Sequence, residues 1–324
     1  MPRKSWTHRL SIVASTVALA TTAQAQDQAV AAAVTPAIAG VVAAGTRIEL
    51  IKDGFTGTEG PVALPDGSLI FTETNANRIT RIAADGSTST FLDNSNGANG
   101  LGLTVDGTLY AVQVANPQVG IVYPPAKVKI LADQFEGAPF GRPNDIVVDK
   151  HNGVYFTDSG ALAKSGQPPT AKPAVYHITP AGDLQRIASD IERPNGIQLS
   201  PDEKVLYVAN TLGEYVFAYD VAADGSVGQR RSFAKLAGWK KTDNGYSSGA
   251  DGLAVDARGR LYVATNIGIE IFNANGEAIG NITLPKQPQN LAFAGPGKKE
   301  LYAVGRGSAY KIAVLTPGFA DRAK

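Results

Sequence analysis

The chain has 324 residues, a formal net charge of +1 and no cysteine. A chain of this length can bury a full core without disulfide bonds, and the lack of cysteine excludes thiolate metal sites and a cysteine nucleophile. The near-neutral charge offers no basic surface for nucleic acid, so no nucleic-acid partner is expected.

The first 25 residues have the pattern of a secretory signal peptide. A basic head with Arg3, Lys4 and Arg9 precedes the apolar run LSIVASTVALATTA and a small-residue cleavage site, AQA. The run is short and rich in Ala and Thr, which favours cleavage after Ala25 over a retained membrane anchor. Cleavage would change the net charge to −2. We therefore expect a periplasmic or secreted protein that has no membrane contact afterwards.

Residues 26–45 form an Ala-rich stretch with no charge after Asp27. This composition predicts a flexible leader or a loosely packed helix without a catalytic role. The rest of the chain, residues 46–324, is expected to be a single domain.

One short unit recurs six times within this domain. Its clearest element is an aromatic or apolar strand that follows a turn such as PDG or KHNG. The six copies are LIFTE (69–73), LYAVQ (109–113), VYFTD (154–158), LYVAN (206–210), LYVAT (261–265) and LYAVG (301–305). Their spacing of 40 to 55 residues is typical of a four-stranded propeller blade. The sequence therefore predicts an all-β, six-bladed propeller, because a two-sheet sandwich would not explain the sixfold recurrence.

The two ends of this domain complement each other. The stretch TRIELIKDGF (46–55) precedes the first full unit, and the last unit is one strand short. We expect the N-terminal strand to complete the sixth blade, which closes the ring and removes an exposed sheet edge.

Each unit also carries a carboxylate or a carboxamide ten or eleven residues before its aromatic strand. The six positions are Glu59, Asn99, Asn144, Asn195, Asp251 and Asn290. The first strand of a propeller blade lines the central channel, so equivalent positions converge on the axis. Two carboxylates crowded there are costly to desolvate unless a cation lies between them. Oxygen ligands alone favour Ca²⁺, with Zn²⁺, Mn²⁺ or Mg²⁺ as alternatives.

A simpler interpretation is that Asn and Asp before Gly only shape tight turns, as in the NG pairs at 99 and 195. The recurrence in all six units, including Glu59, favours the metal site. His151 lies in a turn and His177 within a strand, so a histidine-rich zinc site is not expected. The chain has no GxSxG motif, which argues against a serine hydrolase. No helix is expected after Gly305–Gly307, which argues against a dinucleotide loop.

Four blocks of the chain resemble the signature blocks of the SMP-30/gluconolactonase/luciferin-regenerating-enzyme family. They are EGPVALPDGSLIFTE, RPNDIVVDKHNGVYFTDSG, RPNGIQLSPDEKVLYVANT and GADGLAVDARGRLYVAT, and the resemblance covers about residues 50 to 315. It implies a six-bladed propeller with a divalent cation, usually calcium, and hydrolysis of sugar lactones or, in some relatives, of organophosphates. It also implies that Glu59, Asn195 and Asp251 are metal ligands. Asn144 would be a ligand or a substrate contact, and Arg142 would bind substrate.

The expected reaction is therefore metal-assisted hydrolysis of a sugar lactone, with Asp251 as the candidate catalytic base. Asn99 is a further candidate for substrate binding, and Asn290 for support of the ligands. Asp158 would either support the site or cap the surface. Substrate choice is expected from the loops 159–172 and 234–246. Two alternatives stay open: an organophosphate or aryl ester hydrolase on the same site, and a non-catalytic binding propeller, which the acid pair Glu59 and Asp251 disfavours.

Overall fold

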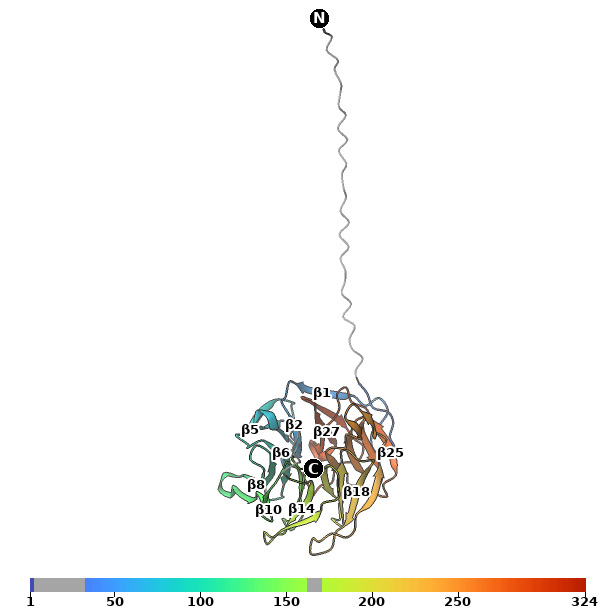
Figure 1. Ribbon diagram of the computed structural model, residues 1–324. Helices are drawn as coiled ribbons and strands as arrows, with labels where there is room; N and C mark the ends of the chain where they lie inside the picture. Colours follow the sequence, from blue (N-terminus) through green and yellow to red (C-terminus); the bar gives the residue numbers. More distant parts are fainter. Residues whose placement is uncertain (3–32, 162–170) are drawn as a thin grey trace. The chain divides into compact units, whose positions relative to one another are not determined.

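The computed structural model describes residues 1–2, 33–161 and 171–324. Six antiparallel sheets of four strands each are arranged as a ring (Figure 1). One sheet corresponds to each sequence repeat, so the predicted six-bladed propeller is confirmed.

The first five blades follow the chain from the central channel outward. Blade 1 is β2 (Thr58–Ala63), β3 (Leu69–Glu73), β4 (Arg78–Ile82) and β5 (Thr88–Asp93). Blade 2 is β6 (Ala98–Leu103), β7 (Leu109–Gln113), β8 (Gln118–Tyr123) and β9 (Lys129–Ala132). Blade 3 is β12 (Pro143–Val148), β13 (Val154–Asp158), β14 (Ala174–Ile178) and β15 (Leu184–Ala188). Blade 4 is β16 (Pro194–Leu199), β17 (Val205–Asn210), β18 (Tyr215–Asp220) and β19 (Arg231–Lys235). Blade 5 is β22 (Leu253–Val255), β23 (Leu261–Thr265), β24 (Gly268–Phe272) and β25 (Ala278–Ile282).

The sixth blade joins the two ends of the domain. It consists of β26 (Asn290–Ala294), β27 (Glu300–Gly305), β28 (Ser308–Ala313) and, outermost, β1 (Ile48–Asp53). Ile48 lies opposite Ile312 in an antiparallel pairing of β1 with β28. The prediction that the N-terminal strand closes the ring is therefore confirmed.

Two short hairpins lie between blades: β10 (Gln134–Phe135) with β11 (Ala138–Pro139), and β20 (Lys240–Thr242) with β21 (Gly245–Ser247). Three 3₁₀ turns join strands within blades: η1 (Thr74–Ala76), η2 (Pro125–Lys127) and η3 (Pro296–Lys298). Within residues 33–161 and 171–324, no helix is long and apolar enough to cross a membrane.

The aromatic strands are the second strands of their blades, and at this position both of their faces are covered. Every residue of β3, β7, β13 and β23 is buried, since neighbouring blades pack face to face. Between blades 5 and 6, for example, the rings of Tyr262 and Phe293 meet edge to face at 5.0 Å. The cores between blades are therefore built from the residues that made the repeat visible.

Residues 33–45 pack against the propeller. Ile38, Val41 and Val42 are buried in the core cluster that also contains Tyr262 and Phe293. This packing differs from the flexible leader expected for these residues, because their apolar side chains cover blades 5 and 6. The predicted signal peptide, residues 1–25, lies almost entirely outside the described residues, as does the start of the leader.

Candidate active site

The six axis positions lie at one end of the central channel. Glu59, Asn99, Asn144 and Asn195 are each the second residue of an innermost strand, and Asn290 is the first residue of β26. Asp251 lies two residues before β22. Because the innermost strands of successive blades are neighbours, the sixfold spacing brings these side chains to the same mouth of the channel.

The glycine that follows four of these residues is explained by crowding between blades. A Cβ atom on Gly60, Gly196 or Gly252 would lie 2.0 to 2.1 Å from an atom of the next innermost strand, and on Gly100 it would lie 2.6 Å away. Only Gly60 has a positive φ, of 48°. The NG and DG pairs are therefore mainly sites of close approach between blades, and the simple turn interpretation fails for all three of them.

Threonines of the second strands hold the axis residues in place. The Thr72 hydroxyl donates to the carbonyl of Asn99 at 2.8 Å, and the Thr157 hydroxyl donates to the carbonyl of Asn195 at 2.6 Å. In each pair the threonine belongs to the preceding blade. The site thus rests on rigid strands whose relative positions are fixed by hydrogen bonds between blades.

Two buried oxygens at the axis have no hydrogen-bond partner among the described residues, Oδ1 of Asn195 and Oδ1 of Asp251. The Asn195 amide nitrogen donates to the Thr211 hydroxyl at 3.0 Å, which fixes the orientation of the amide. Buried polar atoms without a partner cost free energy, and a cation would satisfy both oxygens. The donor set therefore fits a hard metal ion.

The two axis carboxyl groups are held in surroundings that disfavour their charge. Burial raises the pKa of Glu59 to about 7, an effect to which Asp145 adds and which Arg142 and Lys324 partly offset. Burial, and then the nearby Glu59 and Asp145, raise the pKa of Asp251 well above its ordinary value. A divalent cation between the carboxylates would reverse both shifts, because it favours their ionised forms.

Asn99 and Asn290 use their amides inside the protein. The Asn290 nitrogen donates to Glu59 Oε2 at 3.2 Å, so Asn290 orients this carboxylate. The Asn99 nitrogen donates to the Asn144 carbonyl at 2.8 Å, and its oxygen accepts from the Thr74 hydroxyl at 3.1 Å. A substrate contact by Asn99 would have to compete with these bonds. The Asn144 side chain makes no such bond within the described part of the chain.

Asp158 supports the segment that carries Arg142. The buried Asp158 carboxylate accepts hydrogen bonds from the backbone N–H groups of Gly141 and Arg142 at 2.7 Å each and from Gly160 at 2.8 Å. The Nε atom of Arg142 is buried and has no partner among the described residues. Asp158 thus fixes the backbone from which Arg142 extends, and this arginine keeps a donor that no described residue uses.

Comparisons with known proteins identify the family of the chain. Residues 57–305 match the family described as SMP-30/Gluconolactonase/LRE-like region. The chain belongs to this family.

Two relatives and one solved structure are similar to this chain over much of its length. The chain is 28% identical to the gluconolactonase of Zymomonas mobilis over 308 residues, which covers 87% of this chain and 85% of that protein. It is 24% identical over 249 residues to the lactonohydrolase oryL of Aspergillus oryzae, covering 64% of this chain and 54% of that protein. The structure of a gluconolactonase from Xanthomonas campestris has a TM-score of 0.73 at 24% identity, covering 87% of this chain and 97% of that one, which shows the shared fold.

Calcium is named in another similar structure. A calcium-binding regucalcin from Agrobacterium tumefaciens has a TM-score of 0.68 at 18% identity, covering 85% of this chain and 98% of that one. In the described part of this SMP-30 family protein, no group of three or more His, Asp or Glu side chains is placed to hold a metal ion. Any cation here would rely on the amide oxygens of Asn144 and Asn195 as much as on the two carboxylates.

Sequence reasoning missed three residues of the site. Gln289 donates to Glu59 Oε1 at 3.3 Å. Asp145 is fully buried next to Asn144, and Lys324 forms an ion pair with it. A signal for Asp145 was present, because it stands where most other units of this family member have glycine. Nothing in the sequence near Lys324 pointed to the channel.

The two histidines that the structure describes lie away from the axis. His177 is buried in β14, stacked on Tyr155 with ring centroids 4.1 Å apart, and His151 is exposed in the turn between β12 and β13. Of the two loops expected to choose the substrate, residues 162–170 lie outside the described part. In the other, the rings of Trp239 and Tyr246 stack at 4.7 Å.

Proposed function

We propose that the protein is an exported hydrolase of sugar lactones that depends on a divalent cation, with Ca²⁺ as the expected ion. The observation that carries this proposal is the pair of carboxyl groups at the axis, Glu59 and Asp251, beside an amide oxygen without a partner on Asn195. The names of its relatives, a gluconolactonase and a lactonohydrolase, support the lactone as substrate. Export is proposed from residues 1–25.

Glu59, Asn144, Asn195 and Asp251 would hold the cation. When bound, it supplies a Lewis acid that polarises the lactone carbonyl and stabilises negative charge on its oxygen. A calcium ion suits these four side chains because it accepts flexible coordination by carboxylate and amide oxygens.

The side chains of the site carry out the remaining steps. Oδ1 of Asp251 would hold the cation, and the other oxygen of the same carboxylate accepts a proton from the attacking water. The free donor of Arg142 binds a hydroxyl or ring oxygen of the sugar, and Asp158 keeps that arginine in place. One water is consumed, the C–O bond of the ring breaks, and the products are a hydroxy acid and its dissociated proton.

The test is hydrolysis of glucono-δ-lactone, followed as acid release. Protein stripped with EDTA should be inactive, and Ca²⁺ should restore turnover more fully than Zn²⁺, Mn²⁺ or Mg²⁺. Full activity after complete removal of metal would contradict the proposal. Metal binding without turnover of any sugar lactone would retain the metal site and reject the substrate.

A second candidate is hydrolysis of aryl esters or phosphotriesters on the same site. The stacked rings of Trp239 and Tyr246 favour it, because they offer an apolar surface in the segment that leads into blade 5. A panel of phenyl acetate and a phosphotriester, measured beside the lactone, distinguishes the two. A non-catalytic binding propeller would turn over none of these compounds.

A further inference from the structure

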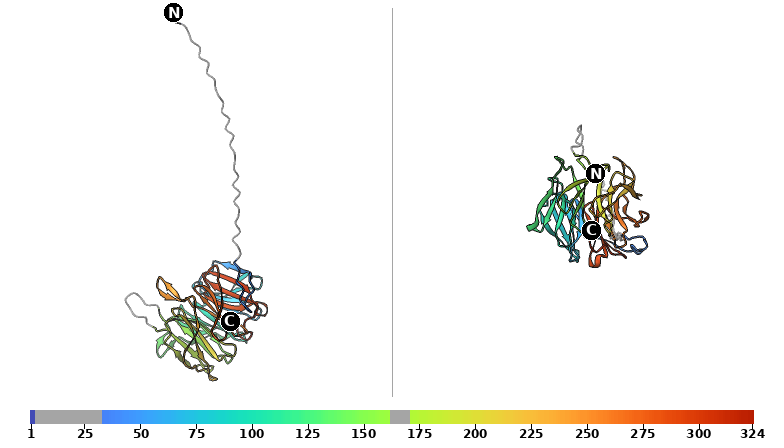
Figure 2. Two further views of the ribbon diagram at one scale, coloured as in Figure 1. Left: turned by 90° about the vertical axis from the view of Figure 1, so that its right-hand side faces the viewer. Right: turned by 90° about the horizontal axis from the view of Figure 1, so that it is seen from below.

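The central channel is closed at the end opposite to Glu59 and Asp251. The segment that closes it, residues 319–324, is called the plug here. In Figure 1 the C-terminus lies at the centre of the ring, and it remains within the ring's outline in the turned views of Figure 2. Val62, Leu103 and Val148, near the far ends of three innermost strands, line the small space beside it.

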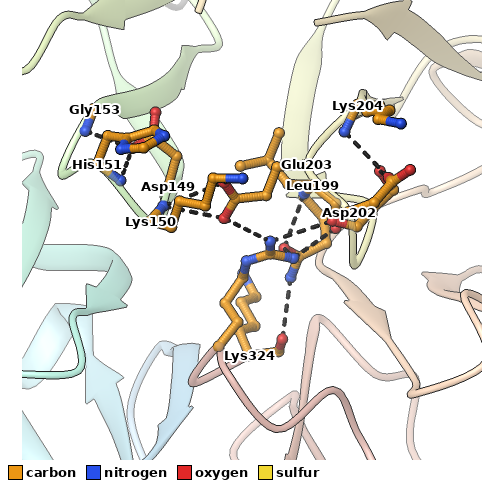
Figure 3. A network of polar contacts seen from close by, with 12 residues as sticks. Asp149, Lys150, His151, Gly153, Leu199, Asp202, Glu203, Lys204 and Lys324 are labelled. Carbon is orange, nitrogen blue, oxygen red and sulfur yellow. Dashed lines mark hydrogen bonds and ion pairs between the residues drawn. The ribbon is translucent and has the colours of Figure 1, made fainter. Parts of the chain in front are cut away.

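The plug is bonded to several blades. The Ala63 N–H donates to the Ala323 carbonyl at 2.8 Å, which joins the plug to blade 1. The Arg322 guanidinium donates to the Leu199 carbonyl at 2.7 Å and to the Glu203 carboxylate at 3.2 Å. Leu199 ends β16 of blade 4, Glu203 lies in the turn that follows β16, and both are labelled in Figure 3. The Phe319 N–H donates to the Val255 carbonyl of blade 5 at 3.3 Å. These bonds fix the path of the plug across the channel.

Lys324 extends the plug inward. Its side chain is buried, and Nζ lies 2.7 and 2.5 Å from the two carboxylate oxygens of Asp145. The Lys324 side chain is only 3% exposed, and that of Asp145 is 1% exposed. The ammonium therefore cannot be screened by bulk water.

Asp145 brings this charge beside the cation site. It is the residue after Asn144 in β12, and its Oδ1 lies against Gly100, the residue after Asn99, where an added Cβ would be 2.6 Å from this oxygen. Because Lys324 Nζ is bonded to this carboxylate, the ammonium lies beside the innermost strands that carry Asn99 and Asn144.

We propose that the charges of the Asp145–Lys324 ion pair set the affinity of the axis site for a divalent cation. Asp145 strengthens cation binding, and Lys324 limits it while keeping the buried Asp145 charge compensated. This inference rests on the proposed function, because it needs a cation at the axis.

The test is calorimetric titration of EDTA-stripped protein with Ca²⁺ alone, in the wild type and four variants. Lys324→Met removes a positive charge and should tighten Ca²⁺ binding on the order of tenfold, and Asp145→Asn removes a negative charge and should weaken it by a similar factor. The double variant keeps the summed charge of the pair at zero, so its affinity should return to within about threefold of the wild type. Lys324→Arg keeps the ammonium-like charge and should also stay within about threefold.

The signs of these changes separate charge from shape. A purely structural pair would lower the melting temperature in both single variants and would shift both affinities in the same direction or not at all, which overturns the inference. A shift in Lys324→Arg equal to that of Lys324→Met also overturns it. If the wild type binds no divalent cation, the proposed function is overturned together with the inference. If the wild type binds Ca²⁺ and the Ca²⁺ affinities of the two single variants do not change in opposite directions, only the inference is overturned.

Discussion

At the scale of single residues, the site depends on carboxyl groups whose charge the surroundings disfavour. Asp251 is ionised only if something compensates its burial and the nearby Glu59. A cation does so, and the same residue is the candidate base. The two roles can be separated by a substitution that keeps the oxygen ligand and removes the base.

We expect Asp251→Asn to lower kcat by about 10³-fold, because an amide cannot accept the proton of the attacking water. Its oxygen can still bind the cation, so the Ca²⁺ affinity should fall by no more than about tenfold, since one negative charge is lost. Lactone turnover and Ca²⁺ titration measure the two effects. Equal losses in both would reduce Asp251 to a ligand.

A second prediction concerns His177, which is buried with neither ring nitrogen bonded within the described residues. Burial lowers its pKa below the ordinary 6.5, so the unfolded chain takes up a proton first as the pH falls. The free energy of unfolding of the protein therefore falls as the pH drops below about 6.5. His177→Phe keeps the stack on Tyr155 and should raise the free energy of unfolding by about 1 kcal/mol at pH 7, and by more at pH 5.

Urea unfolding at both pH values measures this difference. The exposed His151, replaced by Gln, is the control and should change neither value by more than about 0.5 kcal/mol. A destabilised His177→Phe variant would show that the imidazole nitrogens have partners in solution.

At the scale of elements, the last residue of the second strand in blades 3 and 4 fixes the segment that enters the innermost strand of the same blade. In blade 3 this residue is Asp158, which holds residues 141, 142 and 160. In blade 4 it is Asn210, whose oxygen accepts from the Arg193 N–H at 3.1 Å. The same position therefore has one architectural task, and in blade 3 this task bears on the substrate.

We expect Asp158→Asn to lower kcat/KM for the lactone about tenfold, mainly through KM, because Arg142 loses its fixed position. The free energy of unfolding should fall by about 2 kcal/mol, since charge-assisted bonds to buried N–H groups are lost. Asn210→Ala is the matched control in blade 4. It should cost stability and leave KM unchanged; a KM effect of equal size there would mean that loosening of any blade impairs the site.

At the scale of the whole molecule, the cation should stabilise the ring. Metal-free protein should lose stability as the pH rises from about 4.5 to about 7, because folded Glu59 keeps its proton longer than in the unfolded chain. Added Ca²⁺ should remove this loss. At a hundredfold excess over Kd it contributes about 2.7 kcal/mol, which raises Tm by several degrees. Thermal unfolding at pH 5 and pH 7.5, with and without EDTA, tests this; a Ca²⁺ effect that shrinks with rising pH would contradict it.

The ring could be predicted from the repeat, because the sequence of every blade contains an aromatic or apolar strand and, ten or eleven residues before it, a carboxylate or amide side chain. The closure by residues 46–55 followed from counting strands. The contacts of the axis residues could not be predicted, since the use of the Asn99 amide inside the protein depends on the distance between blades. The packing of Ile38 was missed because a composition rich in alanine hides a few residues that bury well. The Asp145–Lys324 pair joins residues that are far apart in the chain, and local pattern says nothing about such a contact.

The closing of the ring by β1 has a consequence for synthesis. Ile48 pairs with Ile312, so β1 leaves the ribosome long before its partner exists. At ordinary rates of translation this interval is on the order of tens of seconds. During that time β1 is an unpaired strand that could join with another nascent chain. Glu49, Lys52 and Asp53 are exposed on it, and these charges disfavour such pairing. The charged residues of β1 thus disfavour association between unfinished chains, in addition to the role of β1 in closing the folded ring.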